Sequence, residues 1–279
     1  MRGRKFSQVD VFTKVAYKGN PVAVVLEAGG LSDAAMQGFA GWTNLSETTF
    51  VLPPSDPAAD YRVRIFTPKA ELPFAGHPTL GTAHAVLEAG LAAARDGKLV
   101  QECAVGLVEL TIGADALSFK LPRYALADAP GGDEATAWIG GAALIGKAKA
   151  VDVGPVWLIA ELAEIAALET LAHDPARLTA YYEQHGLTGA TLFACAGERV
   201  VVRSFAPGDG IPEDPVCGSG NAAVAAYRLV SGQIGAGSRY RASQGRQLGR
   251  DGWIDIRIGG ADVHVGGSCV TCVRGEVQL

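Results

Sequence analysis

Two glycine-rich turns, each followed by an apolar helix, carry most of the side chains in this sequence that could do chemistry. The first turn runs Phe74-Ala-Gly-His-Pro-Thr-Leu-Gly81, and the second runs Glu213-Asp-Pro-Val-Cys-Gly-Ser-Gly-Asn221. Unpaired backbone N–H groups and the positive end of the helix dipole favour an anion at such a helix start. If the two helix starts face each other, they form a cleft suited to a carboxylate.

Several residues of these turns are candidates for binding or acid/base roles. His77 precedes a proline and is expected in the first helical positions, where it could cap the helix, bind an anion or move a proton. Cys217, at the start of the second helix, should have a lowered thiol pKa and so act as an acid/base or nucleophile, unless it is only apolar filler. Asp214 is either an active-site carboxyl or a turn residue. Backbone and hydroxyl donors are expected from Gly76, Gly218, Ser219 and Gly220.

A further carboxyl, Glu47, stands at the head of an apolar strand that continues as Thr48-Thr-Phe-Val-Leu52. Burial there would raise its pKa toward a value useful for proton transfer. The alternative is an exposed carboxylate at the end of a strand. The sequence leaves both open at this point.

The elements that position these residues recur in the two halves of the chain, where Thr48-Thr-Phe-Val51 is matched by Thr191-Leu-Phe-Ala194. Strands are expected at 47–52 and 61–67, the second with clean alternation, before the first turn and helix, and at 191–195 and 199–205, before the second. A weakly patterned stretch from about Ala125 to Gly146 separates the halves. Further helices are expected at about 32–42, 161–171 and 175–185. A duplicated, two-lobed protein is therefore predicted, with its small-molecule site in the cleft between the lobes.

The composition of the chain disfavours several classes of binding partner. The 279 residues carry a formal charge of −5 without a basic run, which disfavours nucleic acid and anionic membranes as partners. There is no uninterrupted apolar run of membrane-spanning length. The odd number of cysteines, five, fits a reducing cytoplasm, and no Cys/His cluster has zinc spacing. We therefore expect a cytoplasmic protein with no metal site.

Three motif matches are discounted. Gly141-Ala-Ala-Leu-Ile-Gly-Lys147 resembles a phosphate loop, but Ala148 stands where the magnesium-binding hydroxyl is required. The glycines from Gly218 onward mimic a dinucleotide-binding turn but follow a proline instead of a buried strand. Cys269 and Cys272 have redox spacing but lie in a strand-like run.

Several other segments of the chain, taken together, make it similar to the phenazine-biosynthesis PhzF-like family. The resemblance is carried by Val9-Asp-Val-Phe12 with Gly19-Asn-Pro-Val-Ala-Val24, by Ser46-Glu-Thr-Thr-Phe50, by Phe66-Thr-Pro with Glu71-Leu-Pro-Phe-Ala-Gly-His-Pro-Thr-Leu-Gly81, and by Glu213-Asp-Pro-Val-Cys-Gly-Ser-Gly220. These segments span nearly the whole chain in the expected order.

The resemblance implies an α+β fold of the diaminopimelate-epimerase type. Its two pseudo-symmetric lobes each wrap a curved, mostly antiparallel sheet or barrel around a central helix. In that fold the C-terminal strands return to the first lobe. The expected lobes are therefore residues 1–124 plus 267–279, and residues 125–266. Homodimers without metal or organic cofactor are common in the family.

The resemblance also assigns roles. Glu47 matches the family's general base, and His77, Asp214 and Ser219 match its other polar active-site residues. Cys217 stands where many members have Thr and matches one catalytic Cys of related epimerases, whose companion would fall at Ala75. Gly220-Asn221 replaces a more frequent Ala-His, so the substrate of the phenazine pathway is not implied.

The leading hypothesis is thus a cofactor-independent isomerase that moves a proton near the carboxylate of a small, cyclic or amino acid. Glu47, His77 and Asp214 are the predicted catalytic residues. Two alternatives remain open: an amino-acid epimerase or racemase that uses Cys217, and a non-catalytic protein that binds small carboxylates on the same fold.

Overall fold

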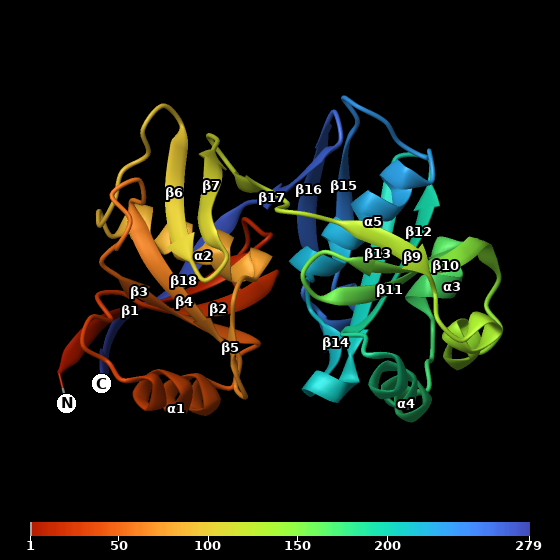
Figure 1. The fold of residues 1–279 in the computed structure, drawn as a ribbon, viewed down its shortest axis with the longest axis horizontal. Helices are drawn as coiled ribbons and strands as arrows, with labels where there is room; N and C mark the ends of the chain where they lie inside the picture. Colours follow the sequence, from red (N-terminus) through yellow and green to blue (C-terminus); the bar gives the residue numbers. More distant parts are fainter. Residues whose placement is uncertain (1) are drawn as a thin grey trace. The chain divides into compact units, whose positions relative to one another are not determined.

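The computed structural model describes residues 2–279. The chain forms two compact units, Met1–Lys120 with Gly266–Leu279, and Leu121–Val265. These boundaries lie a few residues from those expected from the sequence. Each unit has its own set of paired strands and its own buried helix (Figure 1).

The first unit consists of nine strands and two helices among the described residues. They are β1 (Gly3–Val11), β2 (Asn20–Val25), α1 (Asp33–Thr43), β3 (Glu47–Leu52), β4 (Tyr61–Phe66), β5 (Glu71–Leu72), α2 (Gly76–Glu88), β6 (Lys98–Cys103), β7 (Gly106–Ile112), β8 (Leu117–Lys120) and β18 (Cys269–Gln278). The strands follow the order β18-β1-β2-β3-β4-β6-β7-β8, with β5 beside the end of β4. Only the pairs β2/β3 and β4/β6 are parallel.

Helix α2 is the centre of the first unit. Ten of its 13 residues are buried, because it packs against β1, β2, β3, β6, β8 and β18. A helix that is apolar on all sides is typical of such a central position. Gly81 allows the close approach, since a Cβ atom there would lie 2.4 Å from Val22 Cγ1.

The second unit repeats this plan. Its elements are β9 (Ala125–Asp128), η1 (Gly132–Ile139), β10 (Leu144–Asp152), β11 (Val156–Leu162), α3 (Ile165–Glu169), α4 (Pro175–His185), β12 (Gly189–Ala196), β13 (Arg199–Ala206), η2 (Pro207–Asp209), β14 (Ile211–Asp214), α5 (Gly218–Val230), β15 (Arg239–Gln244), η3 (Arg246–Leu248), β16 (Gly252–Gly259) and β17 (Asp262–Gly267). The strand order is β9-β10-β11-β12-β13-β15-β16, with β14 beside β13. The parallel pairs are β11/β12 and β13/β15, and α5 is the buried central helix.

One pair of side chains fixes the correspondence between the two units. Arg64 makes a two-pronged hydrogen bond with Glu71 and lies over the ring of Phe66 at 5.1 Å. Arg203 does the same with Glu213 and with the ring of Phe205, at 5.0 Å. The two arginines are therefore equivalent, and the α+β class with duplicated architecture is confirmed.

The strand register corrects the alignment of the two halves by one residue. The sequence repeat matched Phe50 with Phe193, but Phe50 lies opposite Arg64 whereas Leu192 lies opposite Arg203. Phe50 is thus equivalent to Leu192. The same shift makes Gly189 the counterpart of Glu47.

Two stretches of the second unit differ from the sequence-based expectation. The weakly patterned stretch before residue 146 contains β9 and the short helix η1. The helix expected at 161–171 is only α3, because Glu161 and Leu162 complete β11. Glycine and alanine there gave too little apolar periodicity to distinguish these elements.

Candidate functional site

Glu47 is the first residue of β3 and pairs with Val22 of the neighbouring parallel strand. Its side chain is 14% exposed, so the carboxyl is largely withdrawn from water but reachable. This agrees with a buried strand-end carboxyl and not with a fully solvated one. The imidazole of His77 lies beside it, with Nδ1 3.4 Å from Glu47 Oε2.

His77 is the second residue of α2. The N-cap is Ala75, which makes no side-chain cap, so His77 is not the capping residue. Its side chain is 6% exposed, and burial lowers its pKa to about 3, against the opposing effect of a hydrogen bond with the Pro21 backbone. The imidazole is therefore neutral at ordinary pH. It lies beside Glu47 as a neutral group and not as a cation.

Asp214 ends β14, where Ser204 of β13 pairs with it. Burial raises the pKa of its carboxyl to about 6, and the charge of Glu213 adds to this. Hydrogen bonds from the Val216 N–H (2.9 Å to Oδ1) and from the Cys217 thiol oppose the rise. A pKa raised in this way is closer to the range that suits an acid/base group.

Cys217 is the N-cap of α5, and its Sγ accepts a hydrogen bond of 3.2 Å from the Gly220 N–H. Its side chain is buried and lies 3.5 Å from Ser219 Oγ. Gly220 brings the helix against the sheet, because a Cβ atom there would lie 2.5 Å from Thr191 Oγ1. In the first unit Gly76 allows a similar close approach, because a Cβ atom there would lie 2.9 Å from Phe119 Cζ.

Trp157 contacts one of the candidate residues, and the sequence did not reveal this. It lies on β11 opposite Gly189, and its indole Nε1 donates a hydrogen bond of 3.1 Å to Ser219 Oγ. No motif surrounds it. The only available signal was a single tryptophan in an apolar strand, which is more often a core residue.

The structure therefore forms two groups of the predicted site residues. Glu47 and His77 meet in the first unit, next to Gly76 at the start of α2. In the second unit, the residues gathered around the start of α5 are Asp214, Cys217, Gly218, Ser219 and Gly220. The expectation that both groups act on one ligand stays a prediction.

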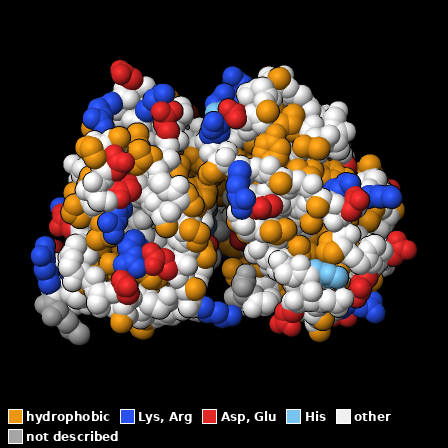
Figure 2. All heavy atoms as spheres, in the orientation of Figure 1, with side chains coloured by type: hydrophobic (Ala, Val, Ile, Leu, Met, Phe, Trp, Pro, Cys, Tyr) orange, Lys and Arg blue, Asp and Glu red, His pale blue; other side chains and the backbone are white. Residues whose placement is uncertain are grey.

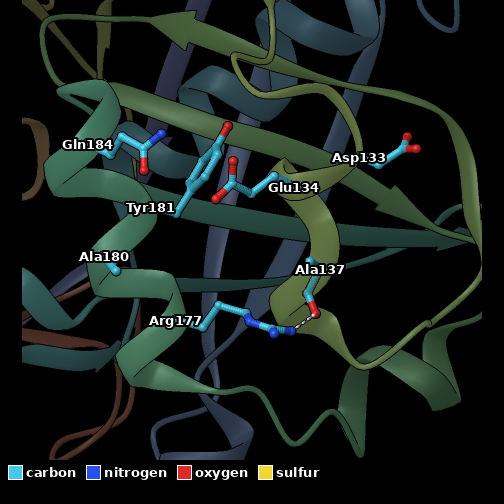
Figure 3. A pocket seen from close by; sticks show the side chains of 7 residues that line it. All are labelled: Asp133, Glu134, Ala137, Arg177, Ala180, Tyr181 and Gln184. Atoms are coloured by element: carbon cyan, nitrogen blue, oxygen red, sulfur yellow. Dashed lines mark hydrogen bonds between the residues drawn. The ribbon is translucent and has the colours of Figure 1, made fainter.

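A separate hollow lies between η1 and α4 in the second unit (Figure 3). It measures about 390 Å³, and the residues that line it are Asp133, Glu134, Ala137, Arg177, Ala180, Tyr181 and Gln184. The Arg177 guanidinium already donates to the Ala137 carbonyl. None of the predicted site residues lines this hollow.

Across residues 2–279, no three His, Cys, Asp or Glu side chains come together in a way that could hold a metal ion. The described helices include none with the length and apolar character needed to cross a bilayer. On the face shown in Figure 2, acidic and basic side chains are scattered among apolar ones.

Comparison with known proteins shows which family and which fold the chain resembles. The model of the phenazine biosynthesis-like family, PhzC-PhzF, matches residues 9–275. The Schizosaccharomyces pombe protein named antisense-enhancing sequence 1 is 37% identical, with 99% of each chain covered. The trans-2,3-dihydro-3-hydroxyanthranilate isomerase of Pseudomonas chlororaphis is 33% identical over 97% of this chain and 98% of its own. A Bacillus anthracis crystal structure of the PhzF family has the same fold, with a TM-score of 0.88 at 22% identity and full coverage of both chains.

The similar structures show that the chain has the diaminopimelate-epimerase-like fold. The chain belongs to the phenazine biosynthesis-like (PhzC-PhzF) family. The predicted isomerase class is confirmed by its relatives, several of which are named as isomerases.

Proposed function

We propose that this protein is a cofactor-independent isomerase in which Glu47 moves a proton on a small carboxylic acid. The observation that supports it best is the pairing of Glu47 with a neutral, buried His77 at the start of α2. A carboxyl that is mostly withdrawn from water but still reachable can take a proton from carbon and return it to a neighbouring atom.

The role proposed for His77 is to orient the carboxyl. A neutral imidazole 3.4 Å from a carboxylate oxygen can restrict the orientation of the carboxyl without adding the positive charge that would make Glu47 a weaker base. With its pKa at about 3, the imidazole keeps this state throughout the pH range in which Glu47 would work.

The roles proposed for the second unit are binding and orientation. The start of α5 offers backbone N–H groups and the Ser219 hydroxyl, which suit a substrate carboxylate. Asp214, whose pKa is raised to about 6, is proposed to exchange a proton with the substrate or hold one of its polar groups. The family resemblance further suggests a homodimer.

A two-thiol racemisation is not supported. Cys217 and Ala75 are the N-caps of α5 and α2, hence equivalent positions, and alanine has no acid/base group. The geometry therefore favours the Glu47 reaction over the epimerase alternative.

The decisive experiment is proton exchange in D₂O, followed by NMR. The panel contains small amino and cyclic carboxylic acids, and trans-2,3-dihydro-3-hydroxyanthranilate as the substrate named for a relative. The natural protein should exchange a carbon-bound hydrogen of at least one compound. Glu47→Gln should slow that exchange by roughly 10²–10⁴-fold while the compound still binds.

Glu109→Gln is the matched control, because Glu109 is an exposed strand carboxyl of the same unit, paired with Lys98. It should leave exchange unchanged. Full activity in Glu47→Gln would reject Glu47 as the base. Tight binding of carboxylates without any exchange would instead support the non-catalytic alternative.

A further inference from the structure

Four side chains around the start of α5 are connected in series. Trp157 Nε1 lies 3.1 Å from Ser219 Oγ, and Ser219 Oγ lies 3.5 Å from Cys217 Sγ. The Cys217 thiol is hydrogen-bonded in turn to the carboxyl of Asp214. The series spans three elements, β11, α5 and the end of β14.

The chemistry of the two ends fixes the direction of every hydrogen bond between them. An indole N–H can only donate, so Ser219 Oγ accepts from Trp157. An ionised carboxylate can only accept, so the thiol hydrogen of Cys217 points to Asp214. The remaining contact, between sulfur and hydroxyl, then has Ser219 as its donor. All donors consequently point from Trp157 toward Asp214.

The backbone reinforces this arrangement. The Gly220 N–H also donates to Cys217 Sγ, at 3.2 Å. With two donors directed at the sulfur, the thiol becomes a better donor to Asp214, because hydrogen bonds in series polarise one another. Burial of Cys217 at 4% exposure keeps water from replacing these bonds.

Trp157 is held in this place by its partner across the strands. It is 4% exposed and lies opposite Gly189 on the parallel strand β12. A Cβ atom at Gly189 would lie 2.7 Å from Trp157 Cζ3. The indole thus occupies the space that a side chain at position 189 would need.

We propose that Trp157 is a positioning residue that makes the Ser219 hydroxyl a hydrogen-bond donor, and that Cys217 is the thiol bridge from this hydroxyl to Asp214. On the proposed function, on which this step rests, a ligand acceptor such as a carboxylate oxygen competes with Cys217 Sγ for this single hydrogen. A ligand ammonium would meet a poorer partner there. The thiol is engaged with Asp214 and is not a free nucleophile.

The first test measures the titration of Asp214 without any substrate. Protein with ¹³C-labelled aspartate carboxyls is titrated by NMR, and the Asp214 signal is assigned by its loss in Asp214→Asn. Cys217→Ala removes a donor to the carboxylate, so the titration midpoint of Asp214 should shift to higher pH. Cys217→Ser keeps a donor and should restore a midpoint near that of the natural protein. An unchanged midpoint in Cys217→Ala would overturn the thiol bridge.

The second test isolates Trp157. Trp157→Phe keeps an aromatic ring but removes the N–H, which should weaken the series and move the Asp214 midpoint to higher pH by less than Cys217→Ala does. Trp138→Phe is the matched control, since Trp138 is a buried tryptophan of the same unit whose Nε1 donates to the Ala135 carbonyl instead. Equal midpoints in the two tryptophan variants would overturn the positioning role.

An infrared measurement covers the case in which a variant titrates poorly. The difference spectrum between the natural protein and Cys217→Ser isolates the S–H stretching band of Cys217. That band should lie at the low frequency of a hydrogen-bonded thiol and move upward in Asp214→Asn. A band at the position of a non-bonded thiol would reject the bridge. Glu47→Gln should alter none of these signals, so this inference can fail while the proposed reaction stands, and the reverse.

Discussion

The two units share a plan but carry their carboxyls at different points of it. Glu47 opens β3 of the first unit, whereas its counterpart in the second unit is Gly189. Asp214 lies opposite Ser204 at the end of β14, whereas the equivalent residue of β5 is Leu72, opposite Ile65. Each unit thus keeps one ionisable group where the other has none.

The helix starts differ in the same complementary way. Helices α2 and α5 both begin with glycine and both have 13 residues, so the second residue is His77 in one and Ser219 in the other. His77 approaches a carboxyl, and Ser219 accepts from an indole. Duplication of a scaffold therefore preserved the backbone donors of both helix starts while the side chains beside them diverged. On the proposed function, such unlike side chains suit an asymmetric proton transfer, since a base and a binding group have different tasks.

The largest effect expected from this comparison concerns the two equivalent arginines. Arg203 is 7% exposed and also donates to the Leu168 and Leu171 carbonyls, whereas Arg64 is 20% exposed. Arg203→Ala leaves a buried carboxylate and two carbonyls without their donor, and should lower the free energy of unfolding by about 3–5 kcal/mol. Arg64→Ala should cost about 1 kcal/mol. Urea denaturation of both variants measures the difference, and equal losses would show that burial does not separate the two sites.

A smaller effect is expected at Gly189, the position that corresponds to Glu47. A Cβ atom there would lie 2.3 Å from the Phe205 carbonyl oxygen and 2.7 Å from the Trp157 ring. Gly189→Ala should therefore cost about 1–3 kcal/mol through overpacking. Gly235→Ala, in the same unit, is the control, because nothing lies within 4 Å of the added atom. Similar unfolding midpoints for the two variants would mean that Trp157 moves aside at little cost.

The sequence was sufficient for the features that depend on local pattern. An apolar run predicted β3, and clean alternation predicted β4. The helix expected at about 32–42 is α1, where Ser32 caps through the Ala35 N–H. The two glycine-rich turns were recognisable because helix starts need small residues at defined offsets. The roles assigned to the candidate residues stay predictions.

The rest depends on contacts between segments far apart in the chain. A one-residue change of register leaves the composition of each strand unchanged, so sequence alone could not reject the match of Phe50 with Phe193. The pairing of Leu192 with Arg203 in the structure does reject it. Trp157 joins Ser219 across 62 residues, and no local pattern encodes such a bond. The depressed pKa of His77 likewise follows from burial, which arises only on folding.

His77 and Asp214, one in each unit, should make stability respond to acid in opposite directions. Burial lowers the pKa of His77 from 6.5 to about 3, so between these values the unfolded chain binds a proton that the folded chain does not. Stability is thus fully present above pH 6.5 and is lost as the pH falls toward 3, by at most about 1.4 kcal/mol per pH unit. His77→Gln should flatten this fall in urea unfolding measured at a series of pH values. His264→Gln is the control, because His264 is a partly buried histidine of the second unit. An equal flattening in His264→Gln would show that the pH dependence does not arise from His77.

Asp214 should contribute the smaller and opposite slope. Its pKa is raised from 3.8 to about 6, so between these values the folded chain holds a proton that the unfolded chain has lost. Stability is greatest below pH 3.8 and declines as the pH rises through 6, because the charged carboxyl is buried. Asp214→Asn has no charge to bury and retains an oxygen for the Val216 N–H, so its advantage over the natural protein should appear on going from pH 4 to pH 7. Asp255→Asn, an exposed partner of Arg241, should show no such gain. If Asp214→Asn gained nothing, burial would not penalise the charge of Asp214. The asymmetry in carboxyl groups between the two units would then rest on Glu47 alone.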